Sequence, residues 1–165
     1  MPLLTTDQAG NLGELIAAAD LSRPVKGRYQ RPLFMPTILG GKYPTVDLIV
    51  DVLAADATRL GFFFVQIKST ESSSLRAVRL RISVPYKKYN ELVILQAPTY
   101  IVGVDVNSST SYLVGAYNKR SVRVSSISKS FRLSDDDVKI NLYKEIIHYW
   151  KINTPAIKSR IFKDV

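Results

Sequence analysis

The stretch Gly61–Thr70, GFFFVQIKST, carries the strongest fold signal in this chain. Three phenylalanines and a valine follow the glycine, as expected for a strand that is buried on both faces. The run then places Gln66 and Lys68 two positions apart, so the period of a strand turns both side chains to the same face. An amide and a lysine at the centre of such a strand indicate either the polar face of an edge strand or a functional site.

The segment before it, Val46–Leu53 (VDLIVDVL), predicts a second strand because it is rich in β-branched and apolar residues. The loop between them, residues 54–60, is short, which favours an antiparallel hairpin. A turn centred between Asp56 and Ala57 would fix the register of the two strands. A slip of one residue would send the side chains of one strand to the other face.

In this register Asp47 lies opposite Gln66, and Lys68 is diagonally adjacent on the same face. Carboxylate and amide oxygens are hard ligands of the kind that Mg²⁺ or Mn²⁺ takes, with waters and a substrate phosphate completing the shell. A bound divalent ion activates water and stabilises charge on a phosphoryl centre, and a nearby lysine can assist. The trio therefore provides the parts for phosphodiester hydrolysis. Asp51 shares this face and is a reserve candidate.

The rest of the chain predicts one domain over residues 1–165, with a mixed α/β or α+β fold around one central sheet. We expect the core over about residues 7–117 and a C-terminal helix with a basic tail over about 134–165. Leu12, Leu15, Ile16 and Ala19 predict one apolar face for the first helix. The other expected elements are a helix over 7–21, an extended or edge segment over 26–39, a basic-faced strand over 79–84, a helix over 85–95, strands over 99–106 and 111–117, and a helix over 134–150.

Composition narrows the possible chemistry. The 165 residues include no cysteine and one histidine, His148, which disfavours disulfides, zinc sites and histidine-based triads. We interpret His148, which has apolar and aromatic neighbours, as a packing residue. No apolar run approaches the roughly 20 residues of a membrane span, and the N-terminus lacks the pattern of a secretory signal. We expect a cytoplasmic chain that has no membrane partner.

The formal net charge of +9 is concentrated in two segments that contain no acid, residues 72–90 and 106–134. Such segments suit a polyanion such as nucleic acid. The alternative is that they form solvated faces that keep the chain soluble. The cations of these segments are Arg76, Arg79, Arg81, Lys87, Lys88, Lys119, Arg120, Arg123, Lys129 and Arg132.

Asp47, followed across a hairpin by Gln66-Ile67-Lys68, resembles the PD-(D/E)XK motif of restriction-endonuclease-like nucleases, in the Gln-X-Lys form of Mrr-type restriction enzymes. The expected order of elements resembles the α-β-β-β-α-β core of that superfamily. The strings VDLIVDV, FFFVQIKST and PTYIVGVD are similar to an uncharacterised branch of small prokaryotic nuclease-like domains. The resemblance covers about residues 12–117.

The resemblance implies that Asp47 binds the metal, that Gln66 is the second ligand and that Lys68 is the catalytic lysine. Glu14 matches the extra acid that many members present from the first helix. The sequence departs from the motif in two ways, because its proline, Pro44, lies three residues before Asp47 and because Gln66 is neutral. A neutral second ligand lowers metal affinity unless Glu14 supplies the missing charge.

Three functions follow from these patterns. The first is an Mg²⁺- or Mn²⁺-dependent endonuclease on DNA, with a role in defence or repair that the resemblance alone suggests. The second is a non-catalytic nucleic-acid-binding module on the same fold. The third is a structural or protein-interaction subunit. A homodimer would place two sites on a duplex, and two-fold pairing is the commonest form of oligomer.

Overall fold

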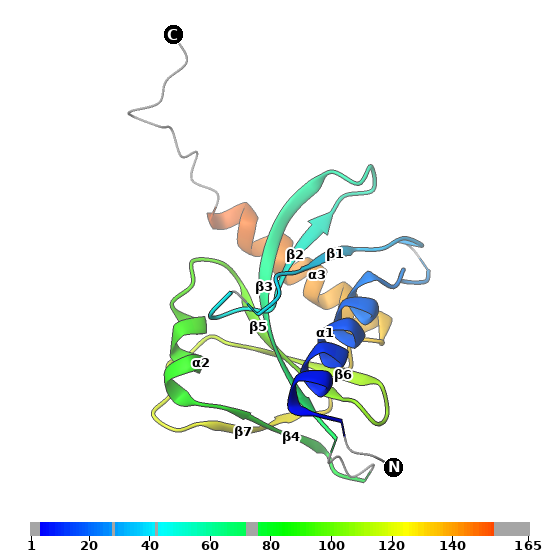
Figure 1. Ribbon diagram of the computed structural model, residues 1–165. Coiled ribbons are helices and arrows are strands. Elements are labelled where there is room, and N and C mark those ends of the chain that lie inside the picture. Colours follow the sequence, from blue (N-terminus) through cyan, green and yellow to red (C-terminus); the bar gives the residue numbers. More distant parts are fainter. Residues whose placement is uncertain (1–3, 28, 42, 72–75, 154–165) are drawn as a thin grey trace.

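The computed structural model describes residues 4–27, 29–41, 43–71 and 76–153 (Figure 1). The basic tail from residue 154 onward therefore lies outside the described residues. Within the described ranges, no helix combines the length and the apolar character needed to cross a membrane. In chain order the elements are α1 (Thr6–Ser22), β1 (Phe34–Ile38), β2 (Leu48–Leu53), β3 (Arg59–Thr70), β4 (Arg79–Val84), α2 (Tyr86–Val93), β5 (Thr99–Asp105), β6 (Thr110–Gly115), β7 (Val124–Ser128) and α3 (Asp136–Asn153).

Five strands form a mixed central sheet in the order β1-β2-β3-β5-β6. β3 and β5 are parallel, and the other neighbouring pairs in this sheet are antiparallel. The predicted α+β class with a mixed sheet is confirmed. The predicted order α-β-β-β-α-β is present with one additional strand, β4, before α2. β1 contains Pro36 and lies at the edge of the sheet, where a strand tolerates proline.

β4 and β7 form a separate two-stranded sheet beside the central one, which the sequence did not predict. Residues of β4 alternate between exposed and buried, whereas β5 is buried along its whole length. A strand with a charged outer face does not suit the interior of a sheet that is covered on both faces. Instead, Leu80 and Ile127 pack on β5 at Gly103, where an added Cβ would lie 2.8 Å and 2.6 Å from their terminal carbons.

Hydrophobic clusters cover both faces of the central sheet. α1 and α3 contribute to one cluster, and α2, β4 and β7 contribute to the other. On β3, Val65 and Ile67 belong to the cluster with α1, whereas Phe64 packs against the cluster with α2. The two-residue period of a strand then assigns Gln66 and Lys68 to the side of Phe64. Figure 1 shows α2, β4 and β7 grouped together on this side.

The buried face of α1 differs from the predicted one and carries small residues. Leu12 and Leu15, which we expected on the apolar face, are 37% and 58% exposed. Gly13 and Ala17 are buried instead, and an added Cβ at Gly13 would lie 1.8 Å from the Oγ of Ser69 on β3. α1 therefore packs on β3 so closely that only a residue without a side chain fits at position 13. The buried face of the helix is centred on this contact and not on Leu12 and Leu15.

Both ends of α1 are fixed. Thr5 forms a capping box at the N-terminus. Near the C-terminus, the Oγ of Ser111 donates to Asp20 at 2.6 Å, and the buried Nζ of Lys139 donates to the carbonyl of Arg23 at 3.0 Å. Burial lowers the pKa of Lys139, and the negative charges of Asp136 and Asp20 oppose that shift. α1 thus holds a set position beside the sheet.

Candidate functional site

The β2–β3 hairpin has the register that the sequence predicted. Leu48 pairs with Val65, and continuing this register by one residue places Asp47, which directly precedes β2, opposite Gln66. β3 begins at Arg59, inside the predicted loop, and a register shift near the turn accommodates the shorter connection. The shift lies at the far end of the hairpin, so it does not alter the pairing beside Asp47.

The carboxylate of Asp47 takes the place of a strand partner at the edge of β3. β2 starts at Leu48, so its ladder with β3 ends at Val65. Two residues further along β3, the backbone N–H of Ile67 donates to the Oδ2 of Asp47 at 2.5 Å. The side-chain amide of Gln66 donates to the same oxygen. These two bonds fix the carboxylate at the point where the hairpin opens.

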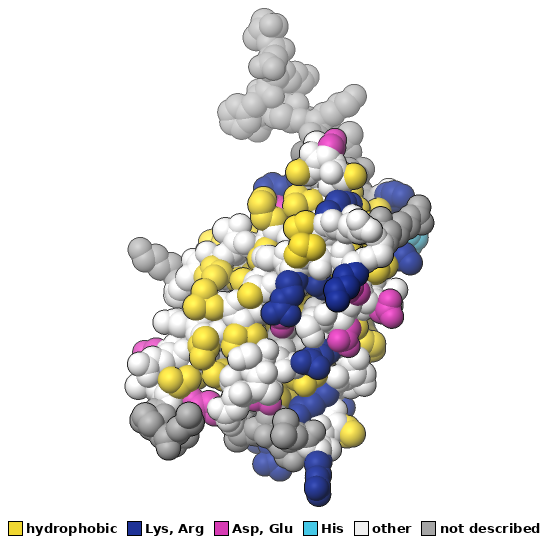
Figure 2. Space-filling model, turned by 90° about the vertical axis from the view of Figure 1, so that its right-hand side faces the viewer, with side chains coloured by type: hydrophobic (Ala, Val, Ile, Leu, Met, Phe, Trp, Pro, Cys, Tyr) yellow, Lys and Arg dark blue, Asp and Glu magenta, His cyan; other side chains and the backbone are white. Residues whose placement is uncertain are grey.

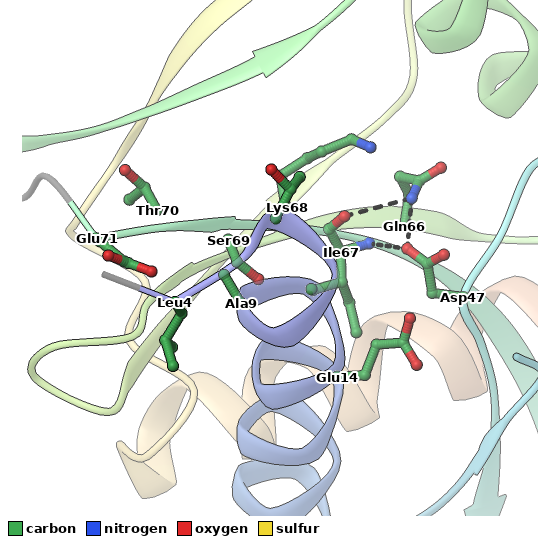
Figure 3. A pocket seen from close by; sticks show the side chains of 12 residues that line it. Leu4, Ala9, Glu14, Asp47, Gln66, Ile67, Lys68, Ser69, Thr70 and Glu71 are labelled. Atoms are coloured by element: carbon green, nitrogen blue, oxygen red, sulfur yellow. Dashed lines mark hydrogen bonds between the residues drawn. The ribbon is translucent and has the colours of Figure 1, made fainter. Parts of the chain in front are cut away.

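The amide of Gln66 is buried, with only 4% of the residue exposed, and its nitrogen faces Asp47. The same nitrogen donates to the carbonyl of Ile67 at 3.3 Å. Gln66 therefore acts in this structure as a hydrogen-bond donor that holds Asp47, and its own oxygen points away from that carboxylate (Figure 3). Turning the amide end for end would bring two oxygens together, and this arrangement requires a cation or a proton between them.

Glu14 extends from α1 toward Asp47, and Figure 3 shows the two carboxylates on the same side of the cavity. Burial, and then the charge of Asp47, raise the pKa of Glu14. Burial also raises the pKa of Asp47, although the Ile67 N–H, Lys68, Gln66 and Lys88 oppose that shift. Two partly desolvated carboxylates that repel each other form a site where a divalent cation is favoured.

The four residues that the motif implies line one cavity of about 550 Å³ between the first half of α1 and the C-terminal half of β3. Lys68 lies one strand period beyond Gln66 and is partly exposed. Ser69 also lines the cavity, and its buried Oγ has no hydrogen-bond partner among the residues that the structure describes. The cavity thus joins a pair of carboxylates, an amide and a lysine in a space that is open to solvent.

The donor set fits Mg²⁺ or Mn²⁺ better than zinc. Among the described residues, no group of three or more His, Cys, Asp or Glu side chains is placed to hold a metal. Asp47 and Glu14 supply two carboxylates, and the carbonyl of Ile67 is a neutral oxygen donor in the same network, which the Gln66 amide joins through its nitrogen. Mg²⁺ typically takes one or two carboxylates and completes its shell with waters and substrate phosphates.

The predicted basic contacts lie apart from this cavity, with one exception. The charge of Lys88, on α2, lowers the pKa of Asp47, so this lysine acts on that carboxylate without lining the cavity. Its Nζ pairs with Glu91 at 3.6 Å. The remaining basic residues are exposed and do not line the cavity: Arg76, Arg79, Arg81, Lys87, Lys119, Arg120 and Arg123.

Other candidates have structural roles. Asp51, the reserve ligand, is buried and pairs with Arg59 at 2.7 Å, so its charge is already neutralised. Asp105, the last residue of β5, accepts from the N–H of Ser108 at 3.4 Å in the following turn. His148 is exposed on α3, so its interpretation as a packing residue is wrong.

The sequence argument missed three residues that shape the site. Gly13 allows α1 to pack closely on β3, and Ser69 is the residue of β3 that it faces. Lys88 adds a second positive charge that acts on Asp47. The available signal was the Gly10-x-x-Gly13 spacing, which puts two glycines on one side of a helix that otherwise has good helix formers. The proximity of Lys88 had no local signal, because it depends on how α2 packs against the sheet.

Comparisons of this chain with models of protein families, with curated proteins and with solved structures found no match. The functional argument therefore rests on the site itself. That site combines two carboxylates with raised pKa values, a buried amide, a backbone carbonyl and a lysine around one cavity. Such a set can bind a divalent cation beside a phosphate and can place an ammonium group next to the reacting centre.

Proposed function

We propose that this chain is a metal-dependent nuclease that hydrolyses phosphodiester bonds in DNA, built on a restriction-endonuclease-like core. One observation carries the proposal: Asp47, Gln66, Lys68 and Glu14 come from three separate segments of the chain and line a single cavity. The mixed sheet and the order of elements support the same view. A buried polar cluster that raises the pKa of its carboxylates is typical of a functional site.

Asp47 and Glu14 would hold Mg²⁺ or Mn²⁺, with the carbonyl of Ile67 as a neutral donor. The ion would supply activation of a water and stabilisation of negative charge on the phosphoryl group. Gln66 orients Asp47 through its N–H, or contributes its oxygen if the amide turns end for end. The hydrogen bond from the Ile67 N–H fixes one carboxylate oxygen of Asp47.

Lys68 lies on the strand of Gln66 and projects along the same side. Its ammonium group is suited to orient the attacking water and to stabilise the charge that develops on the phosphate oxygens. Lys88 adds positive charge from the α2 side, where it assists in attracting the substrate phosphate. Neither role requires a histidine or a cysteine, which agrees with the composition of the chain.

DNA is the preferred substrate in this proposal because the resemblance to restriction-type nucleases points there. A cytoplasmic location and a role in defence or repair belong to the same proposal. A homodimer would present two cavities to the two strands of a duplex.

Plasmid cleavage with Mg²⁺ and with Mn²⁺ tests the proposal. The wild type should nick or linearise the plasmid, and Asp47→Ala should reduce the rate at least about 100-fold, because it removes the carboxylate that anchors the site. Asp135→Ala, which changes an exposed acid outside the cavity, is the matched control and should cut normally. Cleavage that persists in folded, clean Asp47→Ala protein would refute the assignment.

A second function, a non-catalytic nucleic-acid-binding module, is favoured by one feature of the site. The amide of Gln66 already satisfies Asp47 without any cation, so the network is closed as it stands. This alternative predicts DNA binding that weakens steeply with salt, because phosphate contacts release counterions. It also predicts no cleavage with either metal, and the plasmid experiment separates the two functions.

A further inference from the structure

A second polar cavity lies on the α2 side of the central sheet, away from the carboxylates. It has a volume of about 260 Å³, and three arginines, Arg79, Arg120 and Arg123, line it together with serines of β7. Its apolar lining includes Ile101 and Val114 of the central sheet. The lining contains no Asp or Glu, and within the described part of the chain none of the three arginines forms an ion pair.

Neutral groups hold two of these arginines in place. The Nε of Arg79 donates to the Oγ of Ser126 at 2.8 Å, and a terminal nitrogen of Arg79 donates to the carbonyl of Ser126 at 3.0 Å. These bonds use part of the guanidinium and leave its other donors free. The β4–β7 sheet is itself packed closely on β5 at Gly103, so Arg79 stands on a rigid support.

Arg120 is fixed from α2. The side chain of Asn90 accepts from the backbone N–H of Arg120 at 2.8 Å and donates to its carbonyl at 2.9 Å. The guanidinium carbon of Arg120 lies 5.2 Å from the ring centroid of Tyr89, within the range of a cation–π contact. Both contacts order the arginine without neutralising its charge.

A larger hollow continues from this cavity along β4. It is lined by Arg76 and Arg81, and Arg79 and Ser126 line both spaces. Other parts of the surface differ: the face shown in Figure 2 carries basic side chains beside acidic ones. Uncompensated arginines around a concave space form a site for an anion, and the planar guanidinium matches a phosphate better than a lysine does.

We propose that Arg79, Arg120 and Arg123 form a phosphate-binding site that holds a backbone phosphate of a nucleic-acid strand away from the carboxylate cavity. The inference rests on the proposed function in one respect, because it takes nucleic acid as the ligand. A cavity of about 260 Å³ suits a phosphate with its sugar, and the continuing row of arginines suits the next phosphates of an extended strand.

The test is fluorescence anisotropy with labelled single-stranded and duplex oligonucleotides in EDTA, in which cleavage does not occur. The main variant is Arg123→Gln, because Arg123 makes no hydrogen bond or ion pair within the described residues and its replacement should leave the fold intact. We expect an affinity loss of about tenfold, the value of one charge-assisted hydrogen bond. The slope of log K against log salt should become shallower by about 0.7 to 0.9.

A triple variant in which Arg79, Arg120 and Arg123 become lysine keeps the net charge and removes the planar forks. It should bind at least about tenfold more weakly than the wild type. A second triple variant removes three exposed cations outside the two acid-free segments, through Lys26→Gln, Lys144→Gln and Lys151→Gln, and should bind nearly as the wild type does. Wild-type affinity in the lysine variant, or equal losses in the two triple variants, would overturn the site.

Further arms identify the ligand and separate this inference from the nuclease proposal. Oligonucleotides with and without a 5′-phosphate should bind alike if a backbone diester occupies the cavity. A strong preference for the 5′-phosphate would mean that the cavity binds a terminal phosphate, and it would overturn the backbone phosphate as the ligand. Binding of poly-glutamate that equals DNA binding and is lost in Arg123→Gln would overturn nucleic acid as the ligand. Asp47→Asn should retain DNA binding, so the phosphate site can be right even if no metal-dependent cleavage exists.

Discussion

The carboxylate cavity and the arginine cavity are both charged sites, but the protein builds them in opposite ways. At the carboxylate cavity the charges are close together and partly buried, and their pKa values are raised. At the arginine cavity the charges are exposed and spread along β4 and the loop before β7, and neutral partners order Arg79 and Arg120. A small cation requires charges that converge on one point, whereas a long polyanion requires charges that remain accessible and spaced.

A glycine in or against the central sheet supports each site. Gly13 lets α1 approach β3, and Gly103 lets the β4–β7 sheet approach β5. In the first case the close approach brings Glu14 to Asp47. In the second it seats the strand that carries Arg79. Because the two sites rest on different contacts, we expect that they can be altered independently. Changes at the carboxylate cavity should lower the cleavage rate, and changes at the arginine cavity should lower the affinity for DNA.

The largest expected effect separates the rate of cleavage, which depends on the carboxylate cavity, from the affinity for DNA, which depends on the arginine cavity. Lys68→Ala should lower kcat at least about 100-fold while changing the Kd for DNA in EDTA by less than about threefold, because the lysine acts on the developing charge. Arg123→Gln should do the reverse, raising Kd and KM with little change in kcat. Single-turnover and steady-state cleavage of a labelled duplex would measure both. If both variants lowered kcat and affinity together, the division between the two sites would be wrong.

The second prediction concerns the neutral residue of the motif. Gln66→Glu replaces the N–H that holds Asp47 with a third carboxylate, so the metal-free protein should melt at a lower temperature. Its affinity for Mn²⁺ should rise about tenfold or more, because the site gains one negative charge. Calorimetric titration with Mn²⁺ and thermal melts in EDTA measure the two changes. Gln66→Met, which keeps the length without a polar group, is the control and should lose metal affinity.

The third prediction tests the packing of α1. Gly13→Ala should lower cleavage about tenfold, because the Cβ of Ser69 would lie 3.1 Å from the new methyl group even if its Oγ rotated away. Adding Ser69→Ala should restore part of the activity by removing the Oγ that lies 1.8 Å from the new methyl group. Gly10→Ala is the matched control on the same helix, since its added Cβ meets nothing within 4 Å.

The outcome of this series is informative in either direction. A Gly13→Ala protein with full activity would show that Glu14 does not depend on the close contact between α1 and β3. A Gly10→Ala protein that lost activity equally would point to the N-terminal part of α1 as a whole. Recovery in the Gly13→Ala, Ser69→Ala double variant is the result that assigns the effect to one contact.

The hairpin could be predicted from sequence because its determinants are local. The strand period and the short loop place Asp47 opposite Gln66, and the structure has this register. The direction of the Gln66 amide could not be predicted, because it depends on which atoms of Asp47 and Ile67 remain without partners where β2 begins. Sequence reasoning therefore placed Asp47 and Gln66 opposite each other but did not give the donor role of Gln66.

The parts that sequence reasoning missed depend on how distant elements pack. α1 was predicted from its periodicity, yet its buried face follows from the contact of Gly13 with Ser69 and not from the leucines. The arginine strand β4 was predicted as a strand with a basic face, but its partner β7 comes from residues 124–128, and no local pattern paired the two. The serines of β7 that order Arg79 could therefore not be connected with it in advance.

The smallest expected effect is on stability and follows from the raised pKa of Glu14. Its folded pKa lies above its ordinary value of 4.5, so the folded state holds this proton more tightly than the unfolded chain does. The free energy of unfolding should therefore fall as the pH rises through 4.5 toward the folded pKa and should be level above that value. Glu14→Gln removes this loss, so its metal-free form should melt a few degrees above the wild type at neutral pH and show a weaker pH dependence.

The same variant connects stability to metal binding. With Mg²⁺ present the wild type should gain stability by mass action, whereas Glu14→Gln should gain less because it lacks one ligand. The difference between the two melting temperatures should therefore become smaller or change sign between EDTA and excess Mg²⁺. The melting temperature of Asp135→Asn should follow that of the wild type in both conditions. An unchanged difference would mean that Glu14 repels Asp47 without sharing an ion with it. The repulsion between Glu14 and Asp47 would then destabilise the fold without being offset by a bound metal, and the carboxylate cavity would serve a purpose other than holding an ion.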